Sequence, residues 1–80
     1  MKLSDLQIFL DIVQAGSLSR AATKRGTSQP NLSRALRDIE HRMSATLLNR
    51  TGRGIETTPA GEAFLEFAVT TLSNYQTLVD

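Results

Sequence analysis

Apolar residues near the N-terminus recur at the spacing of an amphipathic helix. Between residues 5 and 15 they stand mostly three or four positions apart, and Gly16 follows this segment. Ser4 with Gln7 three positions later matches a capping box. We therefore predict a first helix over about residues 5–15.

Two further helices are predicted after it, separated by a short turn. Ser17 suits the N-cap of a short helix over about residues 18–25, which Gly26 would end. Ser28 suits the N-cap of a longer helix over about residues 29–43. Two helices joined by a short glycine-containing turn are typical of a helix-turn-helix, whose second helix enters the major groove of DNA.

The helix over residues 29–43 is predicted to have two distinct sides. Leu32, Leu36, Ile39 and Met43 follow one another at helical spacing, so we expect this stripe to face the core. The other side offers side chains of the types that contact bases or phosphates, namely Gln29, Asn31, Ser33, Arg34 and Arg37. Helix N-termini are commonly polar, but that tendency does not explain arginines at the start of a helix.

The hydrophobic pattern changes period after residue 43. The β-prone segments 46–50 and 55–57 flank Thr51-Gly52-Arg53-Gly54, which has the composition of a turn. We predict a two-stranded hairpin over about residues 46–57, a wing beside the helix-turn-helix at about residues 18–37. Arg53 at its tip could enter a minor groove or hold a phosphate, although a turn with one exposed charge is common.

A long final helix is predicted from the Thr58-Pro59 pair to Val79, because Thr suits the N-cap and Pro the first turn. Its apolar side chains fall on one broad face: Phe64, Phe67, Ala68, Leu72, Tyr75, Leu78 and Val79. Such a helix is roughly 30 Å long, which exceeds what so small a core can cover. We favour pairing of this face with the same helix of a second chain over complete packing on the first helix.

The distribution of charge along the chain is more informative about function than the overall composition. The 80 residues carry a net charge of only +1, yet residues 20–53 hold eight basic and two acidic side chains, a net +6. A basic middle between acidic ends fits a surface that binds a polyanion. Besides the residues above, we expect contacts to the DNA backbone from Ser17, Ser19, Arg20, Ser28 and Arg50.

Other classes of function find little support. The chain has no cysteine for a disulfide and no cluster of metal-ligand residue types, so no cofactor is expected. His41, its single histidine, has no nucleophile motif or phosphate-binding loop to accompany it, so we expect no enzyme. No apolar run suggests export or a membrane span, and a cytoplasmic protein is expected. The alternative to DNA binding is a protein-interaction module that uses the last helix.

Five groups of residues match a known family in the same order. They are Gly16-Ser17-Leu18-Ser19-Arg20-Ala21-Ala22, Ser28-Gln29-Pro30-Asn31-Leu32-Ser33-Arg34, Ile39-Glu40, Leu47-Leu48-Asn49-Arg50 and Thr58-Pro59-Ala60-Gly61. In these motifs the chain resembles the N-terminal domain of bacterial LysR-type transcriptional regulators. The resemblance implies an all-α fold with a small β-hairpin: a winged helix-turn-helix over residues 1–58 and a linker helix over residues 59–80.

The resemblance also implies partners and contacts. The partners are double-stranded DNA and a second copy paired through the linker helix, with tetramers in the full-length protein. A small-molecule effector would bind a C-terminal domain that this chain lacks. Contacts made by the family map onto Ser28, Gln29, Pro30, Ser33 and Arg34, and the wing contact onto Arg53.

Four positions depart from the family pattern. Arg25 stands where leucine is usual, so we expect its stem to pack and its guanidinium to reach solvent or a carboxylate. Ser44 replaces a usual glycine, so the corner after the third helix is expected to differ slightly. Leu48 replaces a common phenylalanine, and Asn31 replaces a small apolar residue and adds a candidate base contact.

Overall fold

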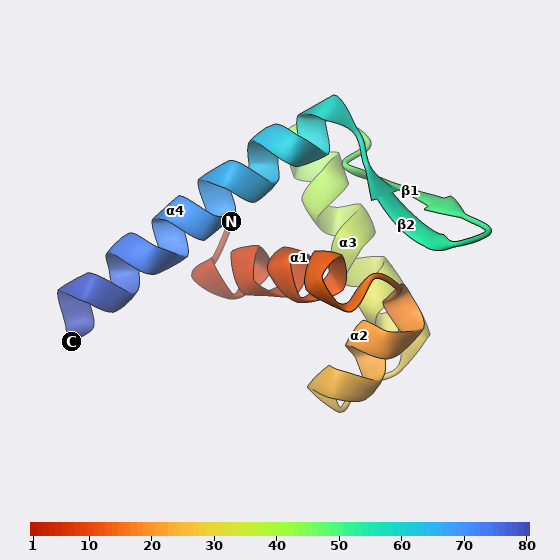
Figure 1. Cartoon of the computed structure of the whole chain (residues 1–80), viewed down its shortest axis with the longest axis horizontal. Helices are drawn as coiled ribbons and strands as arrows, with labels where there is room; N and C mark the ends of the chain where they lie inside the picture. Colours follow the sequence, from red (N-terminus) through yellow and green to blue (C-terminus); the bar gives the residue numbers. More distant parts are fainter.

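The computed structural model describes residues 1–80 and contains four helices and one β-hairpin. The elements are α1 (Leu3–Ala15), α2 (Leu18–Arg25), α3 (Gln29–Met43), β1 (Leu48–Thr51), β2 (Gly54–Thr57) and α4 (Pro59–Val79). In Figure 1, α1 lies in front of α3, and α2 lies at the bottom of the view. The hairpin projects to the right as a wing. The last helix, α4, begins near the hairpin and projects beyond α1 to the free C-terminus. The predicted fold class is confirmed.

Serine caps fix the starts of the second and third helices. The hydroxyl of Ser17 accepts a hydrogen bond from the Arg20 N–H at 3.1 Å, and that of Ser28 accepts one from the Asn31 N–H at 3.2 Å. Gly26 ends α2 in the left-handed conformation, at a φ of 68°. Because Gly26 ends α2 and the Ser28 hydroxyl satisfies an N–H at the start of α3 that has no helical partner, the turn between α2 and α3 is defined at both ends.

The first helix begins two residues earlier than predicted, so the assignment of Ser4 as its N-cap was wrong. Lys2 is the capping residue, and its backbone N–H donates to the Asp5 carboxylate at 2.9 Å. An acidic side chain at the third helical position satisfies a free N–H and also interacts favourably with the helix dipole. This combination starts the helix at Leu3.

The corner after α3 keeps glycine-like geometry although a serine occupies it. Ser44 has a φ of 54°, and its N–H donates to the carbonyl of His41 at 3.1 Å. The left-handed conformation costs a non-glycine residue roughly 1–2 kcal/mol. Met43, just before this corner, is 44% exposed, so its predicted place on the buried stripe was wrong.

The core lies where the first three helices, the start of the hairpin and the first half of α4 meet. Phe9, Ile12, Ile39 and Leu47 are fully buried there. The ring of Phe64 on α4 meets Phe9 edge to face, with 4.8 Å between ring centres. Such aromatic pairs add about 0.5–1.5 kcal/mol to the gain from burial. The first half of α4 is therefore part of the domain's own core.

Of the two positions expected for the Arg25 guanidinium, in solvent or on a carboxylate, the structure shows the second. Its guanidinium forms an ion pair with Asp11, which lies on α1 and is almost completely buried. The amide of Gln7 donates a second hydrogen bond to Asp11, at 2.9 Å. The polar side chain at position 25 thus joins the end of α2 to α1.

We predict that Arg25→Ala lowers the free energy of unfolding by about 1–3 kcal/mol, because it leaves a buried carboxylate without its charged partner. Thermal unfolding followed by circular dichroism would measure the loss. Lys24→Ala is the matched control, since Lys24 is exposed and forms no ion pair. Equal stability of the two variants would contradict the prediction.

Candidate nucleic-acid interface

The start of α3 presents the predicted contact residues on its exposed side. Pro30, Asn31, Arg34 and Arg37 are exposed and Gln29 is half-buried, while Leu32 and Leu36 are buried on the opposite side, as predicted. We call the exposed side formed by Gln29, Pro30, Asn31, Arg34 and Arg37 the recognition face. Local hydrogen bonds orient two of them: Arg34 Nη1 donates to Asn31 Oδ1 at 3.3 Å, and Asn31 Nδ2 donates to Thr27 Oγ1 at 3.4 Å. The guanidinium of Arg34 thus has a preferred direction on an exposed surface.

Ser33 does not lie on the recognition face, so the expectation that it points outward was wrong. The residue is only 8% exposed, and its hydroxyl accepts a hydrogen bond from Arg50 Nη2 on β1 at 2.7 Å. The helical pattern alone predicted no neighbour for this side of α3, but the side chain of Arg50 reaches it from the hairpin. Arg50, predicted to contact phosphate or a groove, is exposed while one of its nitrogens is occupied by Ser33.

The wing is a short antiparallel hairpin with Arg53 in its exposed turn, as predicted. Arg50 pairs with Ile55 and Thr51 with Gly54, and the Arg53 N–H donates to Thr51 Oγ1 at 3.1 Å. Gly54 has a φ of 124°, and a Cβ there would lie 2.3 Å from the carbonyl oxygen of Gly16. The strand after the tip therefore lies directly against the turn between α1 and α2.

Residues predicted to contact the DNA backbone come together from three elements. A crevice of about 150 Å³ lies between the start of α2, the start of α3 and the hairpin; its lining includes Ser17, Ser19, Gln29, Arg50 and Thr51. Arg20 and Ser28, which are next in sequence to the lining residues Ser19 and Gln29, are exposed. The hydroxyls of Ser17 and Ser28 already accept hydrogen bonds as helix caps. Thr51 was not predicted as a contact residue, because the sequence placed it in the turn of the hairpin, whereas the structure places it at the end of β1.

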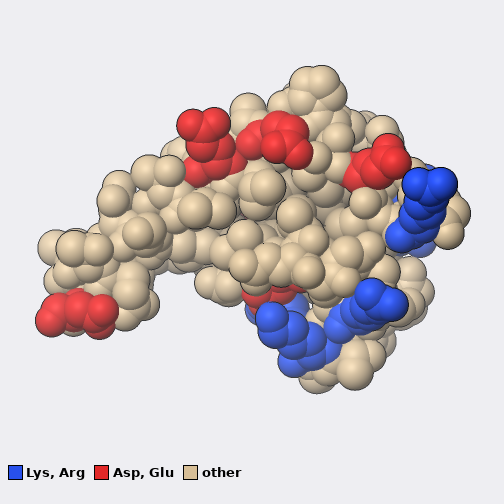
Figure 2. Space-filling view, viewed as in Figure 1, with Lys and Arg blue, Asp and Glu red and all other residues tan.

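Charge is distributed unevenly over the surface. Arg25 with Asp11 is the only ion pair in the structure, so the seven other basic residues between positions 20 and 53 lack an acidic partner within 4.0 Å. All seven are exposed. In Figure 2 blue side chains gather around α2 and the hairpin, while red ones lie mainly along the upper edge and at the tip of α4. Unpaired exposed cations beside a helix-turn-helix can attract a polyanion.

A carboxylate that was not predicted to matter secures the base of the wing. Glu40 on α3 accepts hydrogen bonds from the backbone N–H groups of Leu47, at 2.6 Å, and Leu48, at 3.2 Å. Glu40 belongs to one of the family motifs, which was the only signal for it in the sequence. These bonds tie the beginning of β1 to the C-terminal half of α3.

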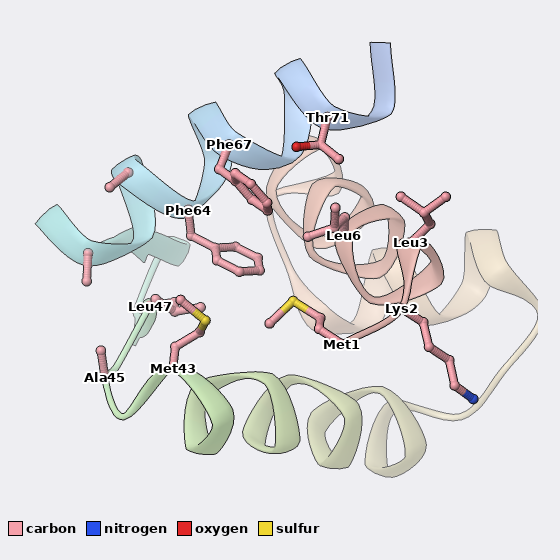
Figure 3. A pocket seen from close by; sticks show the side chains of 12 residues that line it. Met1, Lys2, Leu3, Leu6, Met43, Ala45, Leu47, Phe64, Phe67 and Thr71 are labelled. Atoms are coloured by element: carbon pink, nitrogen blue, oxygen red, sulfur yellow. The ribbon is translucent and has the colours of Figure 1, made fainter. Parts of the chain in front are cut away.

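The apolar face of α4 divides into two parts. Phe64 and Ala68 are buried in the domain's own core, so their assignment to a dimer contact was wrong. Phe67, Tyr75 and Val79 are about half exposed, Leu72 is partly buried, and Leu78 is 82% exposed. An apolar groove of about 720 Å³ is lined by residues that include Phe67, Met1, Leu3 and Met43 (Figure 3). By helical spacing, Leu78 lies on the same side of α4 as Phe67.

Metal and membrane features give no further site. No group of three or more His, Cys, Asp or Glu side chains is arranged to hold a metal ion. His41 is exposed at the end of α3. None of the helices has both the length and the apolar character needed to cross a bilayer.

The fold and this surface define a winged helix-turn-helix domain. Residues 3–62 match the model of bacterial regulatory helix-turn-helix proteins of the lysR family, and the chain belongs to this family. It is 38% identical over 76 residues to the HTH-type transcriptional activator TtdR of Escherichia coli K12, covering 95% of this chain and 24% of TtdR. The chain is 37% identical over 79 residues to the HTH-type transcriptional regulator BenM of Acinetobacter baylyi, covering 99% of this chain and 26% of BenM. The chain thus spans about a quarter of the length of these relatives.

Solved structures agree with this assignment. BenM_DBD in its catB site 1 DNA complex superposes with a TM-score of 0.92 at 37% identity, covering 99% of this chain and 85% of that one. CbnR_DBD in its DNA complex gives a TM-score of 0.91 at 36% identity, covering 100% of this chain and 92% of that one.

Proposed function

We propose that this chain is the DNA-binding domain of a bacterial transcription regulator. In this proposal α3 enters the major groove of double-stranded DNA and Arg53 on the wing reaches the adjacent minor groove. The observation that carries the proposal is the exposed recognition face of α3, with Asn31, Arg34 and Arg37 free of acidic partners beside an equally unpaired Arg53. Arginine and asparagine can bind the edges of guanine and adenine through paired hydrogen bonds. The similarity to BenM_DBD and CbnR_DBD, both solved with DNA, supports the same geometry.

Fluorescence anisotropy with labelled duplexes at several salt concentrations tests this proposal. Binding that releases counterions should weaken steeply as salt rises, in proportion to the number of phosphates contacted. A duplex recovered by selection from a random-sequence library should bind more tightly than an unselected duplex. Absence of binding at low salt would refute the proposal and favour the protein-interaction module.

As part of the same proposal, two copies pair through the outer half of α4. Tyr75, Leu78 and Val79 have little cover within the chain, and an apolar groove lies beside Phe67 on the same helix. In an antiparallel pair related by a twofold axis, the end of each helix lies beside the beginning of the exposed part of its mate. Leu78 of one copy would then lie near the groove of the other.

We predict that Leu78→Glu shifts the chain from dimer to monomer, because a carboxylate would be buried in an apolar contact. Sedimentation equilibrium over a range of protein concentrations would measure the change. Ser73→Glu is the matched control, since Ser73 is exposed on the opposite side of α4. A Leu78→Glu dimer as stable as the control dimer would contradict this pairing.

Three other expectations stay predictions. They are assembly into tetramers in the full-length protein, a small-molecule effector bound by a separate C-terminal domain, and a cytoplasmic location. The relatives TtdR and BenM are named as transcriptional regulators, and the family assignment supports regulation rather than catalysis for this domain.

A further inference from the structure

One hydrogen bond directly joins the side chains of the two elements proposed to contact DNA. Arg50 Nη2 on β1 donates to Ser33 Oγ on α3 at 2.7 Å, and no other hydrogen bond links a side chain of the hairpin to a side chain of α3. Ser33 is 8% exposed while Arg50 is exposed, so this contact is partly buried. A hydrogen bond from a charged donor in such a place is stronger than an ordinary neutral one.

We propose that Ser33 and Arg50 form a positioning pair that fixes the wing relative to α3. In this role the pair fixes the position of Arg53 at the wing tip relative to Arg34 on the recognition face, so that both can contact the same duplex at once. The inference rests on the proposed DNA binding and assigns Ser33 a role that acts through Arg50.

The geometry of the hairpin's attachment supports a positioning role. Glu40 binds the backbone at the base of β1, and Ser33 binds Arg50 farther along the same strand. Residues 33 and 40 are two helical turns apart on one side of α3, a separation of about 10 Å. Without the Ser33–Arg50 bond, these hydrogen bonds from α3 would hold only the base of β1, whereas two attachments this far apart define the direction of β1 relative to α3.

Arg50 is also the outermost link between the hairpin and α3. Its strand partner, Ile55, donates its backbone N–H to the Gly16 carbonyl at 3.3 Å, which supports the other edge of the hairpin. Arg53 lies in the turn that closes the hairpin, beyond Thr51 at the end of β1. A small rotation at Arg50 is therefore enlarged at the tip, where the contact with DNA is proposed.

A double-mutant cycle tests whether Ser33 acts through Arg50. The variants Ser33→Ala, Arg50→Ala and the double variant are compared by anisotropy on a duplex selected by the wild-type domain. We expect Ser33→Ala to weaken binding about tenfold in the wild-type background, the effect of losing a hydrogen bond from a charged group. In the Arg50→Ala background it should weaken binding less than about twofold, because the partner is already gone. Equal losses in both backgrounds, or no loss in the wild type, would overturn the proposal.

Two further measurements separate positioning from a direct contact or a loss of stability. Ser33→Ala removes no charge, so the loss of a direct contact by Ser33 would leave the slope of affinity against salt unchanged, whereas a displaced wing that loses the contact of Arg53 should make the slope shallower. Arg53→Ala should cost less in the Ser33→Ala background than in the wild type, because a displaced wing contributes less. A full Arg53 effect in that background would overturn the proposal.

The conservative variant and a matched control complete the experiment. Ser33→Thr keeps the hydroxyl and should retain most of the affinity that Ser33→Ala loses. Ser73→Ala removes an exposed hydroxyl on α4 and should leave DNA binding unchanged. Circular dichroism confirms that each variant is folded at the assay temperature; a Ser33→Thr variant that is folded yet as weak as Ser33→Ala would count against the proposal. Failure of the wild type to bind any duplex would instead refute the proposed function itself.

Discussion

Replacing Gly61 by alanine is expected to destabilise the domain by about 3–5 kcal/mol, a large part of the total stability of a domain of this size. Gly61 is buried in the first turn of α4, and a Cβ there would lie 2.0 Å from the carbonyl oxygen of Leu47. The atom that the Cβ would meet belongs to the backbone, so a change of side-chain rotamer cannot relieve the clash.

The neighbouring hydrogen bonds prevent an inexpensive adjustment. The carbonyl of Leu47 accepts the N–H of Thr58 at 3.0 Å, and the Thr58 hydroxyl accepts the N–H of Gly61, also at 3.0 Å. Moving α4 away would break this network and withdraw Phe64 from Phe9. Thermal unfolding should therefore show a melting temperature lower by roughly 20 °C.

Gly52→Ala is the matched control for this prediction. Gly52 lies in the exposed turn of the wing, where an added Cβ meets no atom within 4 Å. Its substitution should change stability by less than about 0.5 kcal/mol. A Gly61→Ala variant that melts within a few degrees of this control would show that α4 can shift without loss of the core.

Arg34→Ala is expected to weaken binding to a selected duplex by about 1–3 kcal/mol and to an unselected duplex by less. Arg34 is exposed in the second turn of α3, and its hydrogen bond from Nη1 to Asn31 limits the directions available to its guanidinium. A guanidinium held in this way can donate two hydrogen bonds to one guanine, whereas a contact to phosphate carries no information about sequence. Anisotropy on both duplexes measures the difference.

Arg42→Ala provides the control for charge. Arg42 is exposed in the last turn of α3, away from the recognition face. Its loss should affect selected and unselected duplexes alike and only slightly. If Arg34→Ala also weakened both duplexes equally, Arg34 would be a phosphate contact and the sequence would be read by other residues.

The sequence predicted those features that depend on neighbouring residues. Serine caps and the left-handed Gly26 placed the helix-turn-helix, and helical spacing placed Leu32 inside and Arg34 outside. The position of Arg25 predicted a packed stem with a guanidinium that reaches either solvent or a carboxylate, and the structure shows the carboxylate, that of Asp11.

Features that depend on packing between distant segments were not predictable in the same way. Ser33 belongs to the polar side of α3 by periodicity, and only the folded hairpin shows that Arg50 covers it. Phe64 and Phe67 look alike in the pattern of α4, yet one is buried against Phe9 and the other is half exposed. The start of α1 was misplaced because two capping arrangements overlap within residues 2–7 and the carboxylate of Asp5 decides between them.

The burial of Phe64 and Ala68 has a consequence for dissecting proteins of this kind. The family match ends at Glu62, in the first turn of α4, before either residue. A fragment cut at that point would keep every residue proposed to touch DNA, yet it would lose the ring that packs on Phe9. The smallest fragment that folds therefore extends beyond the segment that matches the family, and truncation experiments should retain α4 at least through Leu72.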